Sequence, residues 1–383
     1  RGVKSRWPGA ARRKTTAALS TWASPSASPS RKQFSLPVHA MPVRTSSYYA
    51  TYHGHAVEHL EELLPVLRRG GNDGKRACIF LAGDSSLDNK FWFENSADAL
   101  NGYEHVLEPP RMKLDICYWL NFEARRRGLS ELFCLNTAIE ATTLNDRSFG
   151  CVLAQDRFIR DHIGANDYLV VSVGGNDLAM APVLATIANI IPLLCCTPQW
   201  CVEHCSVACP PNLHVDCGCF GCGLPGCVAG TLCGWPPGMG YFVDLFANRV
   251  QNYIVNMLGS RRPRKVVACM IYFLDVAGRG SWADGFLCCM GYNCAPSRLQ
   301  SAIRAVFNLA TRRIRIPGTE VVAMPLFEVL DGSCSEDYVQ RVEPSPTGGR
   351  KIAAALIDAI LDGEDDGSEA MLLRPPGGAS MQR

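Results

Sequence analysis

Five short apolar runs constrain the fold of this chain more than any other feature of its sequence. Each run is rich in β-branched and aromatic residues, and none alternates with polar residues as a half-exposed strand would. The runs are Ala77–Ala82, Leu132–Ile139, Tyr168–Val173, Val266–Phe273 and Glu320–Pro325. Such runs predict strands buried on both faces, and strands of that kind belong to a parallel sheet covered by helices.

Helical patterns fill most of the intervals between these strands. The expected helices are Asp115–Arg127, Phe149–His162, Val243–Leu258, Pro296–Arg312 and Gly348–Leu361. Alternating strands and helices imply crossover connections, with ligands bound at the carboxyl ends of the strands. The sequence therefore predicts one α/β domain over residues 76–362.

A further amphipathic helix is expected before this domain, at His53–Arg69 within a segment that spans residues 46–75. Its leucines recur at helical spacing, and two glycines end the pattern.

The two ends of the chain differ from the domain in composition. The first acidic residue is Glu58, and the segment before it is rich in Arg, Lys, Ser, Ala and Pro. That composition is typical of an organelle transit peptide, which would make the protein organellar. An upstream extension with Met41 as the true start explains it equally well. We expect no fixed fold in residues 1–45, and a flexible polar tail in residues 363–383.

The overall composition excludes several classes of protein. The chain has 383 residues, of which 47% are hydrophobic and 19% charged, with a net charge of +2. These values suit a soluble globular protein and argue against nucleic acid or an anionic membrane as partner. The longest apolar stretch, Leu178–Cys196, contains two prolines and predicts a buried helix rather than a transmembrane segment. Nothing in the sequence selects an oligomeric state.

Polar segments follow the first three expected strands. Gly83-Asp84-Ser85 follows the first, Asn136–Thr143 the second and Gly174–Asp177 the third. A serine on a turn between a strand and a helix is exposed at the sheet edge, beside backbone N–H donors that can stabilise an oxyanion. A loop N–H near Ala141, the N–H of Ser85 and the Asn176 amide would supply three such donors. Each segment taken alone is better explained as an ordinary capped turn.

The order of these segments resembles that of the SGNH (GDSL-type) hydrolases across residues 77–362. The resemblance implies a flavodoxin-like three-layer αβα sandwich with strand order 2-1-3-4-5. It also implies ester hydrolysis or acyl transfer on a small-molecule ester or acylated substrate, without a cofactor. Ser85 would be the nucleophile, and Ser85, Ala141 and Asn176 would form the oxyanion hole. The supporting loops would contain Gly83, Asp84, Gly174, Gly175 and Asp177.

The last block of the family pattern is altered in this chain. Where the family has Asp-x-x-His-Pro, Gln340 stands at the aspartate position and Glu343 at the histidine position. Glutamate is a weaker base than histidine unless burial raises its pKa. Three interpretations remain open. Glu343 acts as an unusual base, His204 or His214 reaches the serine, or the domain has lost hydrolysis and binds a carbohydrate, lipid or protein partner.

A cysteine-rich insertion, residues 195–240, separates the third and fourth strands. Ten cysteines lie between Cys195 and Cys233. Such a cluster indicates structural disulfides or a structural zinc site, and a loop with neither is the third alternative. The candidate zinc ligands are Cys217, Cys219, Cys222 and Cys227, because Cys219-x-x-Cys222 has a spacing common in zinc sites. From its place in the topology, the insertion is expected to cover the site as a lid.

Overall fold

The computed structural model describes residues 42–69, 75–180, 184–212, 230–278 and 280–362. The predicted N-terminal segment and C-terminal tail therefore lie almost entirely outside the described residues. The last residues of the N-terminal segment, however, belong to the fold. Val43–Arg44 form strand β1, which pairs in parallel with β4 (Leu107–Glu108), so the boundary that we placed after residue 45 is too late.

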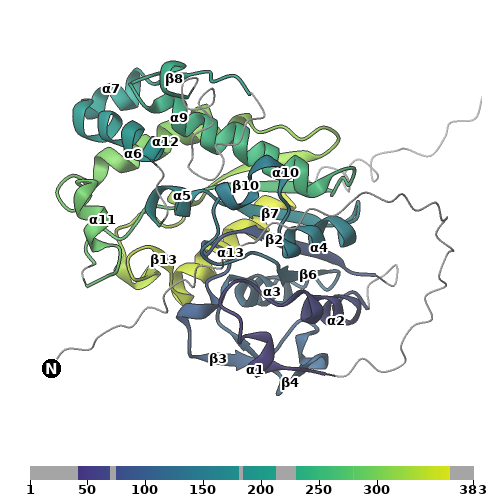
Figure 1. Cartoon of the computed structure of the whole chain (residues 1–383). Coiled ribbons are helices and arrows are strands. Elements are labelled where there is room, and N and C mark those ends of the chain that lie inside the picture. Colours follow the sequence, from purple (N-terminus) through teal and green to yellow (C-terminus); the bar gives the residue numbers. More distant parts are fainter. Residues whose placement is uncertain (1–41, 70–74, 181–183, 213–229, 279, 363–383) are drawn as a thin grey trace, which may run out of the picture. The chain divides into compact units, whose positions relative to one another are not determined.

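A five-stranded parallel sheet forms the centre of the domain (Figure 1). Its strands are β2 (Ala77–Gly83), β6 (Leu132–Asn136), β7 (Tyr168–Ser172), β10 (Lys265–Met270) and β11 (Glu320–Pro325). They lie in the order β6-β2-β7-β10-β11, and every neighbouring pair is parallel. Counted along the chain within this sheet, the order is 2-1-3-4-5. The α/β class and the parallel sheet expected from the five apolar runs are confirmed.

Two groups of helices cover the sheet. α3 (Ile116–Arg126) and α13 (Pro346–Leu361) pack against each other, and α3 contacts β6 while α13 contacts β10 and β11. α4 (Ala154–His162) packs against α10 (Val250–Leu258) and α2 (Val57–Leu67). Parallel crossovers are right-handed, so connections that run outward in opposite directions from β2 and β7 place α3 and α10 on opposite faces. The result is three layers.

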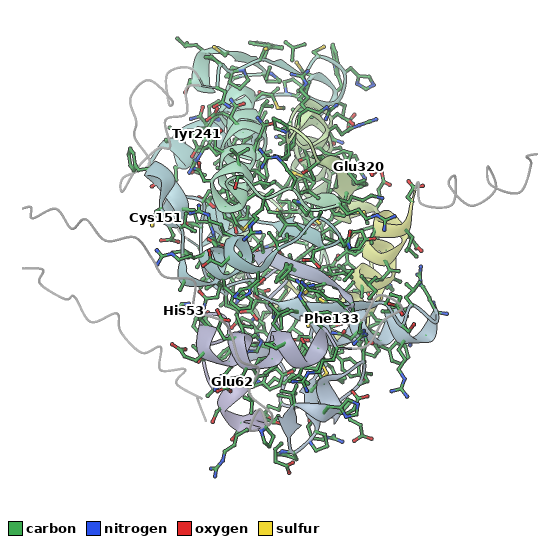
Figure 2. All side chains as sticks on the ribbon, turned by 90° about the vertical axis from the view of Figure 1, so that its right-hand side faces the viewer. His53, Glu62, Phe133, Cys151, Tyr241 and Glu320 are labelled. Carbon is green, nitrogen blue, oxygen red and sulfur yellow. The ribbon has the colours of Figure 1, made fainter. Side chains whose placement is uncertain are left out.

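The core between these layers is densely filled. Figure 2 shows side chains throughout the space between sheet and helices, with the fully buried Phe133 of β6 and the exposed Glu62 of α2 labelled.

Two helices begin later than their sequence patterns predicted. α2 begins at Val57 rather than His53, because Gly54 has a φ of 72° and the ring of His55 is buried against that of Tyr48. α4 begins at Ala154 rather than Phe149, whose φ of 53° cannot continue a right-handed helix. In both places the backbone conformation of a single residue, and not the spacing of apolar residues, decides where the helix begins.

A mostly helical part of the domain packs beside the sheet, in the upper left of Figure 1. Its helices are α5 (Gly175–Ala179), α6 (Leu184–Ile191), α7 (Gln199–His204), α9 (Met239–Val243), α11 (Asp284–Cys289) and α12 (Pro296–Leu309). Two π-helical turns, η4 (Pro192–Cys196) and η5 (Asp244–Arg249), continue α6 and α9. The helix expected at Val243–Leu258 is thus the run from α9 through η5 to α10.

The remaining elements are short. α1 is Thr45–Tyr48, and four more strands form two antiparallel pairs: β3 (Ser96–Asp98) with β5 (Arg111–Lys113), and β8 (Val207–Ala208) with β9 (Gly234–Trp235). None of the helices in the described ranges is both long and apolar enough to cross a bilayer.

Part of the cysteine-rich insertion is described. The four candidate zinc ligands and His214 lie in 213–229, outside the described residues. At the base of the insertion, Cys209 N donates to Cys233 O at 3.0 Å, next to the β8–β9 pair. The cysteines in the described part of the chain are free thiols, and no group of three or more potential metal ligands occurs there.

Candidate functional site

Ser85 lies on a turn that the end of β2 dictates. Gly83 has a φ of 128°, and a Cβ added to it would lie 1.8 Å from the carbonyl oxygen of Ser172 on β7. Only glycine fits there. Asp84 N then donates to Ser172 O at 3.0 Å, and the Asp84 carboxylate accepts from Ser86 N at 3.0 Å and Ser86 Oγ at 2.7 Å. These bonds fix the turn with Ser85 at its centre.

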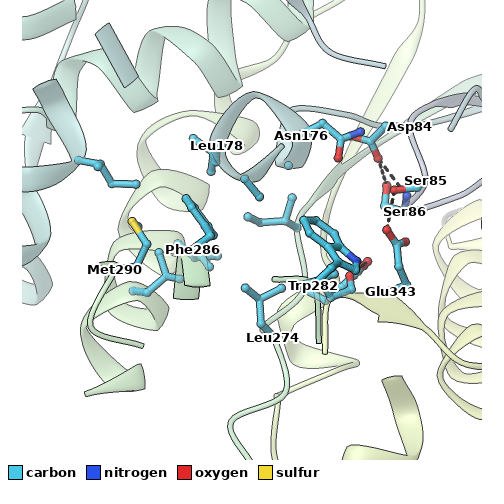
Figure 3. Close-up of a pocket in the computed structure, with 18 residues that line it drawn as sticks. Asp84, Ser85, Ser86, Asn176, Leu178, Leu274, Trp282, Phe286, Met290 and Glu343 are labelled. Atoms are coloured by element: carbon cyan, nitrogen blue, oxygen red, sulfur yellow. Dashed lines mark hydrogen bonds between the residues drawn. The ribbon is translucent and has the colours of Figure 1, made fainter. Parts of the chain in front are cut away.

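Glu343 is brought to Ser85 by a tight hairpin. β12 (Tyr338–Val339) pairs with β13 (Glu343–Pro344), and the connecting residues Gln340 and Arg341 both have positive φ, 54° and 67°. Ser85 Oγ donates to Glu343 Oε1 at 3.0 Å (Figure 3). The two residues at the serine and histidine positions of the family pattern are therefore in direct contact, although 258 residues separate them.

Three further contacts hold this hairpin in place. Asn89 Nδ2 donates to Pro344 O at 2.9 Å, which ties the hairpin to the serine loop. Tyr272 OH donates to Val342 O at 2.7 Å. The buried Arg341 donates to Asp275 O and, at 2.8 Å, to Asp284 on α11. Glu343 is thus carried on a rigid support, which predetermines its distance from Ser85.

Burial dominates the electrostatics of Glu343. It raises the pKa of this carboxyl to about 8, with smaller upward contributions from Asp84 and Asp88, while the Ser85 hydrogen bond lowers it. Its second oxygen, Oε2, is buried and has no hydrogen-bond partner in the described part of the chain. Most of this carboxyl is therefore protonated at neutral pH, and the ionised fraction that can act as a base grows as the pH rises toward 8.

The second polar segment lies directly against the serine turn. Ile139 N and Thr142 Oγ1 both donate to Gly83 O, at 3.0 and 3.3 Å. Ala141 has a φ of 57°, the left-handed conformation that glycine adopts most easily. No acceptor is recorded among the described residues for the N–H of Ala141 or of Ser85.

The third polar segment is joined to the second. Asn176 Nδ2 donates to Thr142 O at 2.9 Å, and one hydrogen of that amide remains available. The Asp177 carboxylate accepts from Leu144 N at 2.9 Å, and burial raises its pKa to about 6. Gly174 has a φ of 110°, and a Cβ there would lie 2.9 Å from the Phe246 ring. The three loops that carry the expected oxyanion donors are therefore adjacent.

Arg147, which no sequence motif marks, connects these loops through its hydrogen bonds. Its guanidinium donates to Gly83 O at 3.1 Å, to Thr142 Oγ1 at 2.9 Å and to Asp156 Oδ2 at 3.0 Å. Its side chain is wholly buried. No sequence pattern distinguishes it from the many surface arginines of the chain.

Arg147→Met should lower the free energy of unfolding by about 3–5 kcal/mol, because the buried Asp156 carboxylate would lose its cation. Arg126→Met is the matched control, since Arg126 is 53% exposed, and should cost less than about 1 kcal/mol. Urea unfolding of both variants measures the difference. Equal stabilities would show that Arg147 does not hold the loops.

A second buried charge cluster lies beyond the serine turn. Lys90 Nζ lies 2.7 Å from Asp88 Oδ2 and 3.2 Å from Glu140 Oε2, and Asn136 Nδ2 donates to Asp88 at 2.8 Å. Burial, then Asp88, raises the pKa of Glu140 to about 8. The cluster joins the segment after Ser85 to the segment after β6. The sequence does not predict its burial, because charged residues in loops are usually exposed.

A cavity of about 90 Å³ opens beside Ser85 (Figure 3). Its polar end is formed by Asp84, Ser85, Ser86, Asn176 and Glu343. The rest of its wall is apolar or aromatic and includes Leu178, Leu274, Trp282, Phe286 and Met290. No sequence motif marks this wall, because its residues come from α5, α6, α11, α12 and the loops between them.

No histidine lines this cavity within the described ranges. His204 lies on α7, where its Nδ1 is 3.0 Å from Trp200 O. Glu343 is therefore the titratable group in contact with Ser85 among the described residues, and His204 is not among the residues that line the cavity.

Comparisons with known proteins give structural similarity only. No family model matches the sequence, and no curated protein matches it. Similar solved structures include a lipase/acylhydrolase from Enterococcus faecalis, at 12% identity and a TM-score of 0.36, covering 74% of this chain and 95% of that one. Another is a carbohydrate esterase family 3 protein from Talaromyces cellulolyticus, at 10% identity and a TM-score of 0.37, with coverage of 76% and 99%. A third is the lipase Lip_vut3 from a goat rumen metagenome, at 11% identity and a TM-score of 0.36, with coverage of 74% and 97%.

Proposed function

We propose that this chain is an SGNH-like ester hydrolase in which Ser85 is the nucleophile and ionised Glu343 is the base. The observation that carries the proposal is the 3.0 Å contact between Ser85 Oγ and Glu343 Oε1 at the polar end of a cavity. A base within about 2.6–3.2 Å of a hydroxyl can remove its proton as the hydroxyl attacks.

The first half-reaction forms an acyl-enzyme. Ser85 Oγ attacks the ester carbonyl carbon while its proton passes to Glu343, and the carbonyl electron pair moves onto oxygen. The N–H groups of Ser85 and Ala141 and the free amide hydrogen of Asn176 stabilise that oxyanion. When the intermediate collapses, the C–O bond to the alcohol breaks and Glu343 returns the proton to the leaving oxygen.

The second half-reaction repeats these steps with water. Glu343 takes a proton from the water that attacks the acyl-enzyme, and the proton then returns to Ser85 as the acid is released. Gly83, Asp84, Gly174, Gly175 and Asp177 hold the loops in this scheme and do not touch the reacting atoms. No cofactor is required.

One observation favours a second candidate, a domain that binds a carbohydrate, lipid or protein partner without turnover. Glu343 has a pKa of about 8, so at neutral pH most of it is a carboxylic acid that cannot accept the serine proton. The two candidates differ in the reactivity of Ser85 above pH 8.

Labelling with a fluorophosphonate probe at pH 9 separates them. We expect the wild type and Ser333→Ala, an exposed-serine control, to be labelled equally. Ser85→Ala should not be labelled, and Glu343→Gln should be labelled at least about 100-fold more slowly, since a general base contributes at least that factor. Unlabelled wild-type protein at pH 9 would favour the binding domain.

A further inference from the structure

We infer that the cavity beside Ser85 binds a linear acyl chain, and that Leu299 and Ile303 set the chain length that it accepts. The inference rests on the proposed function, because it assigns the acyl side of the same ester. It also names the residues of this chain that would select one ester over another.

Two adjoining cavities form the proposed subsite. The outer cavity, of about 90 Å³, opens at Ser85, and the inner cavity, of about 30 Å³, lies farther from Ser85, between α6, α9, β10 and α12. Five side chains line both cavities, so the two adjoin along one wall. These shared residues are Leu178, Ile190, Ile271, Leu299 and Ile303.

The chemistry of the walls selects the ligand. The inner cavity is lined by Leu, Ile, Phe, Met, Ala and Val side chains alone. The outer cavity carries its charged and amide groups only at the Ser85 end. A sugar or peptide needs hydrogen-bond partners along its length, which these walls do not offer. A group with one polar end and an apolar tail matches them.

An unpartnered donor lies at the polar end. Trp282 lines the cavity beside Glu343 (Figure 3), and its Nε1 is buried without an acceptor among the described residues. Glu343 Oε2 lacks a partner as well. A buried N–H without an acceptor is costly, and the two polar atoms without partners lie at the same end of the cavity as Ser85. The ester group therefore belongs at this end and the acyl tail at the other.

The junction between the cavities is formed on α12. Leu299 and Ile303 are four residues apart, on the same face of that helix, and both line the outer and the inner cavity. A short acyl group such as acetyl remains in the outer cavity. A longer one passes these two side chains and fills the inner cavity.

The test compares p-nitrophenyl acetate, butyrate, octanoate and dodecanoate at pH 9. We expect kcat/KM of the wild type to rise by up to about fourfold per methylene that becomes buried, equivalent to ~0.8 kcal/mol. Octanoate should then exceed acetate at least about tenfold. Equal rates for the two esters would overturn the inference while leaving the proposed function intact.

Two substitutions at the junction should shift the preference in opposite directions. Leu299→Trp should lower the ratio of kcat/KM for octanoate to that for acetate at least about tenfold, because the added bulk narrows the junction that only a longer chain must pass. Leu299→Ala should raise the ratio of dodecanoate to octanoate. Val255→Trp, at an exposed position on α10, is the matched control and should leave the chain-length profile unchanged.

A binding measurement separates the inference from the chemistry. Ser85→Ala cannot form an acyl-enzyme, yet it should bind cis-parinaric acid, whose fluorescence increases in apolar surroundings, and octanoate should displace the probe. The double variant Ser85→Ala, Leu299→Trp should bind it at least about tenfold more weakly. If no ester is hydrolysed but the probe binds, the proposed function fails and the acyl subsite stands. If esters are hydrolysed but Ser85→Ala binds neither acid, the subsite is wrong.

Discussion

Glu343→Gln is expected to lower kcat/KM for short aryl esters by about 100- to 10,000-fold, the usual contribution of a general base. The amide keeps the size of the side chain and can still accept the Ser85 hydrogen bond, but it cannot take the proton. In the wild type, log kcat/KM should rise with pH at unit slope and level off near pH 8, because only the ionised carboxylate is active and its pKa is about 8. The Gln variant should lack this rise.

The same substitution should stabilise the fold at alkaline pH. The folded-state pKa of Glu343 is raised from the ordinary 4.5 to about 8, so between these values the folded protein keeps a proton that the unfolded chain has released. The stability present below pH 4.5 is therefore lost as pH rises to 8, by as much as ~5 kcal/mol. Glutamine carries no charge and escapes this loss.

Thermal unfolding of both proteins at pH 5 and pH 9 measures this effect. We expect similar Tm values at pH 5 and a Tm for Glu343→Gln at least about 3 °C higher at pH 9. The control is Glu336→Gln, at an exposed carboxyl close in the chain, which should change neither rate nor Tm. A pH–rate profile that is flat from 6 to 9 in the wild type would show that Glu343 is not the base.

Gly83→Ala is expected to prevent stable folding, with a loss of more than about 4 kcal/mol. The added Cβ would lie 1.8 Å from Ser172 O, a backbone atom of the neighbouring central strand that cannot move aside. The φ of 128° is also one that residues with a side chain rarely adopt.

Gly128→Ala supplies the matched comparison for this prediction. Gly128 also has a positive φ, 73°, but nothing lies within 4 Å of the position of its Cβ. The cost there should be about 1–2 kcal/mol, which is that of the left-handed conformation alone. Circular dichroism and urea unfolding of the two variants test the difference. A Gly83→Ala protein as stable as Gly128→Ala would show that the turn can relax to accommodate a side chain.

Much of the sheet, and the meeting of the polar loops, could be predicted from the sequence. Continuous apolar runs leave few alternatives to a buried parallel sheet, and the carboxyl ends of adjacent parallel strands necessarily meet at one edge. Gly83 pairs with Ser172 and Leu81 with Asn136, which places the segments after β2, β6 and β7 side by side. The proximity of Ser85 and Asn176 to one cavity follows from that register.

The rest of the site could not be predicted, because it depends on packing between distant segments. Arg147 is buried because Asp156 compensates its charge, and Lys90 because Glu140, fifty residues further along the chain, does so together with Asp88. The apolar wall is formed by residues of α5, α6, α11 and α12. The spacing of apolar residues in these helices would be the same if they only packed into the hydrophobic core. The contact between Ser85 and Glu343 requires positive φ at two consecutive residues, Gln340 and Arg341. Neither residue type favours that conformation, so the sequence does not predict the turn.

The hairpin that carries Glu343 also contributes to the wall of the cavity. Val342 and Glu343 both line it, and Arg341 joins the hairpin to α11, whose Phe286 lies opposite. An occupant that fills the cavity displaces water from the carboxyl and makes its ionisation still harder. Shape and acidity are therefore not independent properties of this pocket. A substitution in the hairpin or in α11 that improved the fit of a bulky substrate would therefore also raise the pH at which the reaction is fastest.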